Sequence, residues 1–208
     1  MIPVNVLAVR YLANASPALA KGLGAPAGMP SLGLLTTDCD DATYIALDAA
    51  TKAADVQVSF GRSFYAGAAN ASTPNAGEVI GILAAATPGA VRSGMEAALS
   101  ALERLGFEET HGVPFLAHTV ASVGSFLAKE AGVPMGSAIA YLIAPPLEGM
   151  YAMDAALKAA DVKLCKLYAP PSETNFGGGL LSGTQSACAA ACAAFADAVS
   201  KVAASPRE

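Results

Sequence analysis

Charged side chains are scarce in this sequence, and their scarcity limits the functions that it can serve. Only 14% of the 208 residues are charged, 54% are hydrophobic, and tryptophan is absent. The net charge is −5 and lysine and arginine form no cluster, which argues against binding to nucleic acid. So little charge covers the surface of a monomer poorly, and we therefore expect apolar surface to be buried between subunits.

Long apolar runs and paired cysteines are also missing. Residues 1–6 lack a basic stretch followed by a long apolar one, so no signal peptide is predicted. The run Ala187–Ala196 is too short and too rich in alanine to span a bilayer. The four cysteines form no CxxC pair, and Cys188 and Cys192 stand one helical turn apart, as core residues do. We therefore expect a cytoplasmic protein with free thiols and no membrane contact.

An internal repeat organises the residues that are present. Asp48–Val56 has the sequence DAATKAADV, and Asp154–Val162 repeats it 106 positions later with only Thr51 exchanged for Leu157. Each copy lies between short apolar runs, an order that predicts strand, helix, strand. A second pair of similar segments, Leu19–Gly24 and Leu127–Gly132, is offset by 108 positions. The pattern indicates a tandem duplication of an α/β module of roughly 100 residues.

Each half is predicted to hold about four strands and two main helices, an α+β arrangement with the helices on one face of the sheet. Strands are expected at 4–11, 31–36, 56–60, 78–83, 138–144, 162–168 and 180–182. The loops are expected at 61–74 and 170–179. Gly106–Pro114 is interpreted as a polar connector between the halves, so the expected domains are residues 1–107 and 112–208.

The repeated motif, followed by a glycine-rich strand and a second helix, resembles the bacterial microcompartment shell domain. Two such domains in one chain resemble the tandem, trimer-forming shell proteins. Several longer segments are similar to the ethanolamine-utilisation shell proteins of the L type: Ser31–Leu35, Asp40–Tyr44, Gly61–Ala68, Ala76–Val79, Ala144–Glu148 and Pro170–Asn175.

The resemblance implies two circularly permuted shell domains, each a four-stranded antiparallel-type sheet with helices on one face. It implies a homotrimer that is a pseudohexamer and that packs edge to edge with other shell proteins in a microcompartment shell. A central, gated pore would pass small metabolites or cofactors, and smaller channels would lie within each subunit. The expected protein is a structural component and not an enzyme, and no bound cofactor is predicted.

Asp40 and Asp41 are the first candidates for a ligand site. An aspartate before a helix is a good N-cap, but capping needs only one carboxylate. At the 106 offset the second half has Pro146 and Leu147, so the fold does not require the acids. Glu78 is a third carboxylate without a counterpart, and an exposed acid at a strand end is the alternative interpretation.

The resemblance places Glu78 near the aspartate pair, facing a small channel together with Glu173 and Thr174. Carboxylates with a threonine hydroxyl suit a small ammonium-bearing molecule such as ethanolamine. Asp40, Asp41 and Glu78 would also hold a divalent cation weakly. Because no histidine stands at metal-ligand spacing, we do not expect a permanent metal site.

Other residues are candidates through the resemblance for contacts of a shell tile. Arg62, Tyr65 and Phe107 are candidates for the central pore and its gate, although an ordinary surface loop with a buried tyrosine would have the same sequence. Lys52 and Lys158, the basic residues of the two repeated motifs, are candidates for the tile edge, the alternative being solvated helix lysines.

Two further functions compete with the shell tile. The first is a tandem small-molecule-binding or regulatory module that is not a shell component. The second is an enzyme that uses the carboxylates as acid and base. His111 and His118 have no nucleophile motif nearby, and no GKS or GKT follows Gly177–Gly179, so neither catalysis nor a phosphate loop is favoured.

Overall fold

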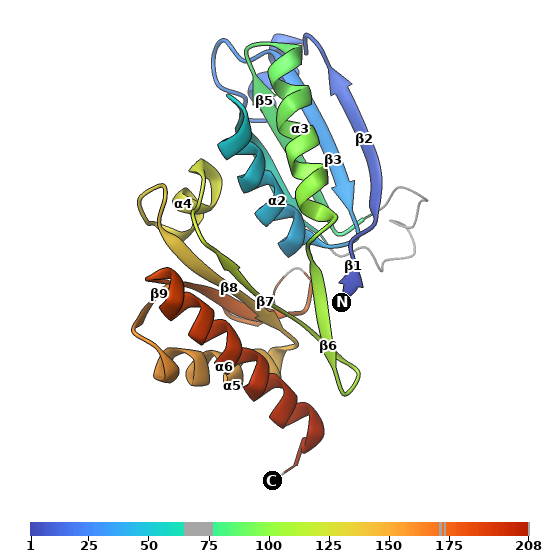
Figure 1. Cartoon of the computed structure of the whole chain (residues 1–208). Helices are drawn as coiled ribbons and strands as arrows, with labels where there is room; N and C mark the ends of the chain where they lie inside the picture. Colours follow the sequence, from blue (N-terminus) through green and yellow to red (C-terminus); the bar gives the residue numbers. More distant parts are fainter. Residues whose placement is uncertain (65–76, 171, 173, 208) are drawn as a thin grey trace. The chain divides into compact units, whose positions relative to one another are not determined.

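The structure, a computed structural model, describes residues 1–64, 77–170, 172 and 174–207. It consists of two compact units (Figure 1). The N-terminal unit contains Pro3–Leu105 and also Gly124–Leu127, whereas the C-terminal unit contains Met1–Ile2, Gly106–Val123 and Ala128–Glu208. Each unit therefore includes a short segment from the other half of the sequence.

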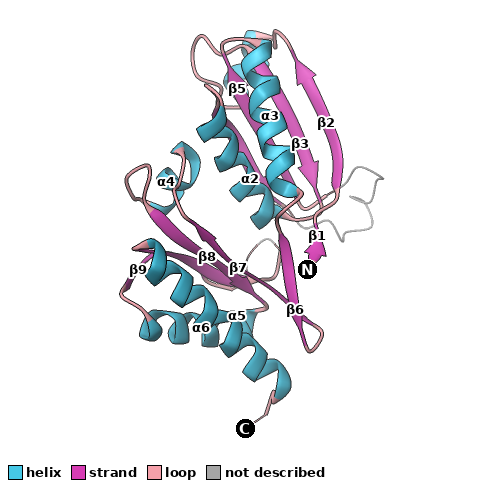
Figure 2. Ribbon diagram, in the orientation of Figure 1, coloured by secondary structure: helices cyan, strands magenta, loops and turns pink. Residues whose placement is uncertain are grey.

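The N-terminal unit is a four-stranded antiparallel sheet in the order β2-β3-β5-β4. Helices α2 and α3 lie side by side on one face of the sheet (Figure 2), while α1 packs with Leu32 and Ile82 on the other. The strands are β2 (Val6–Leu12), β3 (Ser31–Thr37), β4 (Gln57–Ser63) and β5 (Val79–Ala85), and the helices are α1 (Pro17–Gly22), α2 (Asp40–Ala53) and α3 (Pro88–Leu102).

Small residues let these two helices approach the sheet. A Cβ added at Gly81 would lie 2.6 Å from Leu47 Cδ1, and one at Gly33 would lie 2.7 Å from Val91 Cγ1. Because neither strand position has a side chain, the leucine and the valine fill the space above the backbone. The core of this unit therefore depends on close contact of helix and sheet.

The C-terminal unit is built on a six-stranded sheet in the order β1-β6-β7-β8-β10-β9. Phe195 of α6 is buried in the core of this unit, together with residues of α5 and of the sheet. Helix α6 is therefore a core helix, although it is long and apolar enough to pass a test for a membrane span. The strands are β1 (Ile2–Pro3), β6 (Gly106–Thr110), β7 (Val113–Val120), β8 (Ala138–Ala144), β9 (Val162–Tyr168) and β10 (Gly177–Gly183), and the helices are α4 (Ser125–Ala131), α5 (Pro146–Ala159) and α6 (Gln185–Ala204).

The predicted α+β fold class is confirmed, and the repeat recurs in backbone detail. The pairing of β4 with β5 skips Ser59, and the pairing of β9 with β10 skips Cys165, which is 106 positions later. Gly24 and Gly132, offset by 108, both have positive φ, 69° and 64°. The two halves are therefore copies of one backbone design, with β1 and β6 added to the second sheet.

Three predicted loops are wrong where the structure has strands. The expected connector Gly106–Pro114 is a β-hairpin, because His111 and Gly112 adopt positive φ and Thr110 pairs with Val113. Strand β4 continues to Ser63, and β10 begins at Gly177, where loops were predicted. Glycine at 177–179 misled the sequence interpretation, since these glycines serve close packing and not a turn.

Replacing Gly178 by alanine tests this packing. The new Cβ would lie 1.9 Å from the Leu142 carbonyl oxygen in the neighbouring strand, so the backbone must shift. We expect Gly178→Ala to lower the free energy of unfolding by about 3 kcal/mol or more. Gly89→Ala is the control, because a Cβ there meets nothing within 4 Å. The thermal midpoint should fall for Gly178→Ala alone, and equal midpoints would contradict the packing argument.

Candidate functional site

The predicted carboxylates lie at the start of α2 and directly before β5. Asp40 and Asp41 are the first two residues of α2, and both are buried. The N-cap residue is Cys39, which makes no side-chain capping bond, so neither aspartate stands at the N-cap position. Asp40 Oδ1 accepts a hydrogen bond of 2.9 Å from the Asp41 N–H. Asp40 thus satisfies one N–H of the first helical turn, a role that takes only one carboxylate of the pair.

Two threonines hold the entry to α2. The Thr43 hydroxyl donates to the Cys39 carbonyl over 2.8 Å, and the Cys39 N–H donates to Thr37 Oγ1 over 3.2 Å. The two hydroxyls are 2.7 Å apart. This buried hydrogen-bond network fixes the backbone at the start of α2, where the two aspartates lie.

Asp40 is linked to β4 through hydroxyl groups. Ser63 hydrogen-bonds its carboxylate, and Ser63 Oγ lies 2.6 Å from the Tyr44 hydroxyl. Burial nevertheless raises the pKa of Asp40, and the hydrogen bonds from Ser63 and Asp41 only oppose that rise. Sequence reasoning missed Ser63 and Tyr44, because tyrosine and serine 19 positions apart carry no pattern that links them.

Glu78 is held by backbone bonds beside the aspartates. Its N–H donates to the Thr37 carbonyl over 2.9 Å, and its carbonyl accepts from Phe64 over 2.8 Å. Burial raises the pKa of Glu78 to about 7, with further contributions from the charges of Asp40 and Asp38. At neutral pH the protonated and the charged form of Glu78 are therefore both accessible.

The structure brings Asp40, Asp41 and Glu78 into one acidic cluster, which we call the acidic site. The structure does not assign the other two predicted ligand residues, Glu173 and Thr174, to the acidic site. Thr174 lies in a turn of the C-terminal unit, and Glu173 is outside the described residues. Their contribution to the acidic site stays a prediction.

The predicted pore residues occupy separate places. Arg62 is exposed on β4, with its guanidinium carbon 5.9 Å from the centre of the Phe60 ring. Phe107 of β6 packs edge-on against Phe176, with ring centres 5.6 Å apart. Tyr65 lies outside the described residues. The pore assignment of these three residues stays a prediction.

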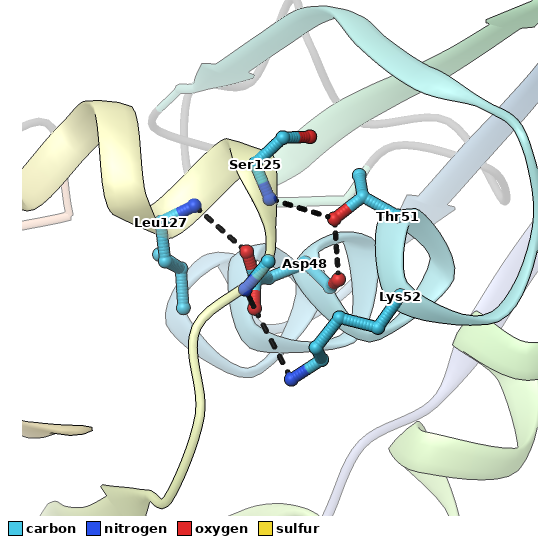
Figure 3. Close-up of polar contacts among 6 residues, drawn as sticks. Asp48, Thr51, Lys52, Ser125 and Leu127 are labelled. Atoms are coloured by element: carbon cyan, nitrogen blue, oxygen red, sulfur yellow. Dashed lines mark hydrogen bonds and ion pairs between the residues drawn. The ribbon is translucent and has the colours of Figure 1, made fainter. Parts of the chain in front are cut away.

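The predicted edge lysines make ion pairs within their own helices. Lys52 Nζ lies 3.3 Å from Asp48 Oδ2, and Lys158 Nζ lies 2.5 Å from Asp154 Oδ2. Asp48 is fully buried and binds two backbone N–H groups as well (Figure 3). The repeat singles out Asp48 in the sequence, but its bonds to backbone N–H groups depend on its burial. The sequence alone does not show that burial.

The described residues give no support for a metal site. Within the described ranges, no group of three His, Cys, Asp or Glu side chains could hold a metal ion. His111 lies in the β6–β7 turn and His118 lies on β7.

Comparisons with known proteins agree with the fold. Residues 31–115 match the family model described as the BMC domain. Over 99% of its length the chain is 56% identical to the bacterial microcompartment shell protein EutL of Clostridium perfringens strain 13, of which it covers 97%.

Solved structures of microcompartment shell proteins also match this chain. Ethanolamine utilization protein EutL from Leptotrichia buccalis C-1013-b superposes with a TM-score of 0.95 at 55% identity, covering 100% of this chain and 97% of that one. A trimeric bacterial microcompartment shell protein, PduB, shares the fold at a TM-score of 0.81 and 19% identity, covering 96% of this chain and 89% of that one.

Fold and similarity together define a bacterial microcompartment shell protein with a tandem repeat. The chain belongs to the EutL family of these shell proteins. It is thus a structural component of a microcompartment shell, which lies in the bacterial cytoplasm.

The raised pKa of Glu78 predicts a pH dependence of stability. Between pH 4.5, its ordinary pKa, and about pH 7, the folded chain holds a proton that the unfolded chain has lost. The free energy of unfolding should therefore fall as pH rises through this window. Glu78→Gln should flatten the fall in thermal midpoint, whereas Glu96→Gln, on the exposed face of α3, should keep it. Parallel curves for both variants would contradict the assignment.

Proposed function

We propose that the chain forms a homotrimeric, pseudohexameric shell tile, with residues 1–107 and 112–208 as its two shell domains. The tile packs edge to edge with other shell proteins, and a central pore lined by Arg62, Tyr65 and Phe107 passes small metabolites or cofactors. Its role is structural and selective, and it catalyses no reaction. Full-length similarity to EutL proteins supports this proposal.

We further propose that the acidic site binds a small ammonium-bearing molecule such as ethanolamine. The observation that carries this proposal is the burial of Asp40 beside Glu78, whose pKa is raised to about 7. The charge of Asp40 raises the pKa of Glu78, and a cation between the two carboxylates would offset that repulsion. The second half, which has Pro146 and Leu147 in place of the aspartates, offers no such site.

Charge also favours this class of ligand at the level of the tile. Three chains of net charge −5 amount to −15 in the proposed trimer. Carboxylates that line a narrow passage attract cations and repel anions, while neutral polar molecules pass with little penalty. Glu173 and Thr174 are proposed as further ligand residues, with the threonine hydroxyl available to a ligand hydroxyl.

Calorimetric titration with ethanolamine tests the acidic site. Asp40→Asn combined with Glu78→Gln removes both charges, and binding should weaken roughly tenfold or more. The wild-type affinity should rise between pH 6 and pH 8, since Glu78 loses its proton there.

A charge-matched control separates this effect from the overall charge of the tile. Glu96→Gln combined with Glu103→Gln removes two exposed carboxylates from α3 and its C-terminus, and it should leave binding unchanged. Equal affinities for both double variants would overturn the site assignment, while the shell role would stand.

The proposed tile edge is tested by removing the repeated lysines. Lys52→Gln combined with Lys158→Gln should abolish flat sheets or tubes in electron microscopy of concentrated protein, while the solution mass stays unchanged. Lys21→Gln combined with Lys129→Gln is the control, because these lysines are also repeated but lie on α1 and α4. Sheets from the first variant would contradict the edge role of Lys52 and Lys158.

A further inference from the structure

Two hydroxyl groups lead from the carboxylate of Asp40 away from the acidic site. Ser63 hydrogen-bonds the carboxylate, and Ser63 Oγ lies 2.6 Å from the Tyr44 hydroxyl. The two hydroxyls stand on different elements, since Ser63 is the last residue of β4 and Tyr44 lies on the second turn of α2. Tyr44 and Ser63, here called the hydroxyl pair, therefore tie the acidic site to the packing of helix against sheet.

The number of protons fixes the direction of these bonds. An ionised carboxylate only accepts hydrogen bonds, so the Ser63 hydroxyl donates its single proton to Asp40. Ser63 Oγ then accepts from Tyr44, which makes the tyrosine the donor at the far end. Because linked hydrogen bonds polarise one another, the bond from Tyr44 strengthens the bond from Ser63 to the carboxylate.

The direction matters because burial disfavours the charge of Asp40. Burial raises the pKa of this carboxyl group, and the hydrogen bond from Ser63 is the largest effect that opposes the rise. An ammonium group is attracted by the charged form of the carboxylate and gains little from the neutral form. The hydroxyl pair thus favours the form of Asp40 that the proposed ligand requires.

The ring of Tyr44 is held by β4 and by a segment from the second half of the sequence. A Cβ added at Gly61 of β4 would lie 3.3 Å from Tyr44 Cε1, so the ring lies directly over a position without a side chain. The ring of Phe126 lies 5.8 Å from that of Tyr44. Contacts with Gly61 and Phe126 together fix where the tyrosine hydroxyl lies.

Phe126 is itself anchored by α2. Asp48 accepts hydrogen bonds from backbone N–H groups on either side of Phe126, from Gly124 over 2.7 Å and from Leu127 over 2.8 Å (Figure 3). Leu127 is only 1% exposed. The buried clamp at Asp48 therefore supports Tyr44, one helical turn closer to the acidic site, through Phe126.

The repeat shows that the fold forms without these groups. The counterparts in the second half carry no hydroxyl, no carboxylate and no aromatic ring: Pro146 for Asp40, Met150 for Tyr44, Ala169 for Ser63 and Ala18 for Phe126. Helix α5 and strand β9 form there nevertheless. The four positions differ together between the halves, as parts of one device are expected to do.

We propose that Tyr44 and Ser63 are positioning residues of the acidic site, which hold the carboxylate of Asp40 charged and oriented for an ammonium-bearing ligand. The proposal rests on the ligand binding proposed above and adds the groups that set its strength. Both residues act through Asp40 and need no contact with the ligand.

A double-mutant cycle on ethanolamine binding tests the hydroxyl pair. Ser63→Ala removes the donor to Asp40, so binding at pH 7 should weaken about tenfold. Tyr44→Phe keeps the ring and leaves Ser63 able to donate, so binding should weaken only about threefold. Added to Ser63→Ala, Tyr44→Phe should cause no further loss, because the link to Asp40 is already broken. Losses that add in the double variant would overturn the proposal.

Matched controls remove the same chemical groups elsewhere. Tyr11→Phe removes a tyrosine hydroxyl on β2, at the other edge of the sheet, and keeps the ring that lies under Arg92. Ser93→Ala removes an exposed serine hydroxyl from α3. Both controls should keep the wild-type affinity. A loss in Tyr11→Phe as large as that in Tyr44→Phe would contradict the proposal.

The charge state of Asp40 gives a second measurement that needs no ligand. Carbon-13 NMR of protein labelled at the aspartate carboxyl carbons follows the titration, and the Asp40 signal is identified by its loss in Asp40→Asn. Asp41, Glu78 and Cys39 also lie near Asp40 and stay in place in every variant. Differences between the titration curves therefore report on the two hydroxyls alone.

The expected order of the pKa values follows from the direction of the bonds. Ser63→Ala should raise the pKa of Asp40 above that of the wild type, and Tyr44→Phe should raise it by less. Tyr11→Phe should leave it unchanged. A purely structural role of the hydroxyl pair would lower the thermal midpoint without moving this titration.

The outcomes separate this inference from the proposed function. A wild type that does not bind ethanolamine overturns the ligand, while a raised pKa of Asp40 in both hydroxyl variants still supports the hydroxyl pair. A wild type that binds, with affinity and pKa unchanged in Ser63→Ala and Tyr44→Phe, overturns the positioning role and leaves the ligand site intact.

Discussion

The buried carboxylate of Asp48 is the interaction on which the arrangement of the N-terminal unit depends. A charge without access to water is tolerated only when hydrogen bonds and an opposite charge surround it, and Asp48 has two backbone N–H groups and Lys52. Those N–H groups belong to a segment from the second half of the sequence, so the chain must cross from one unit to the other to satisfy the charge.

The repeat gives this constraint a second consequence. The same aspartate and lysine recur on α5, but there the pair is exposed and no segment of the described chain covers it. One sequence motif thus serves a buried charge in the first half and a solvated ion pair in the second.

The acidic site departs from the repeat for a different reason. At the positions of Asp40 and Asp41 the second half has Pro146 and Leu147, and the first turn of α5 carries a single acid, Glu148. Burial raises the pKa of Asp40 and of Glu78, which favours the neutral forms of both carboxyl groups in the folded chain. Buried carboxylates of this kind, present in one copy of the repeat alone, are what the proposed ligand site requires.

Much of the fold could be predicted from the sequence, because the repeat supplied the same signals twice. Strands Ala138–Ala144 and Val162–Tyr168 were predicted with the bounds that the structure has, since short apolar runs end there at turn residues. The β6–β7 hairpin was missed because its turn, His111–Gly112, lies among polar residues and lacks the usual Asn-Gly or Asp-Gly signal.

The candidate site was predictable only in part. The acids Asp40, Asp41 and Glu78 stood out by their absence from the second half, but their supports did not. Ser63 reaches the site because β4 runs three residues beyond its predicted end, and this extension follows from pairing with β5 and not from local sequence. Asp48 was noticed only as a repeated residue, since an aspartate on a helix is usually solvated.

The mass of the wild-type protein in solution tests the central claim, that this chain is one of several identical copies in a closed shell tile. Native mass spectrometry should give three times the chain mass of 20.7 kDa, with no larger open chains at low concentration. A monomer, or a series of growing oligomers without a closed trimer, would contradict the tile.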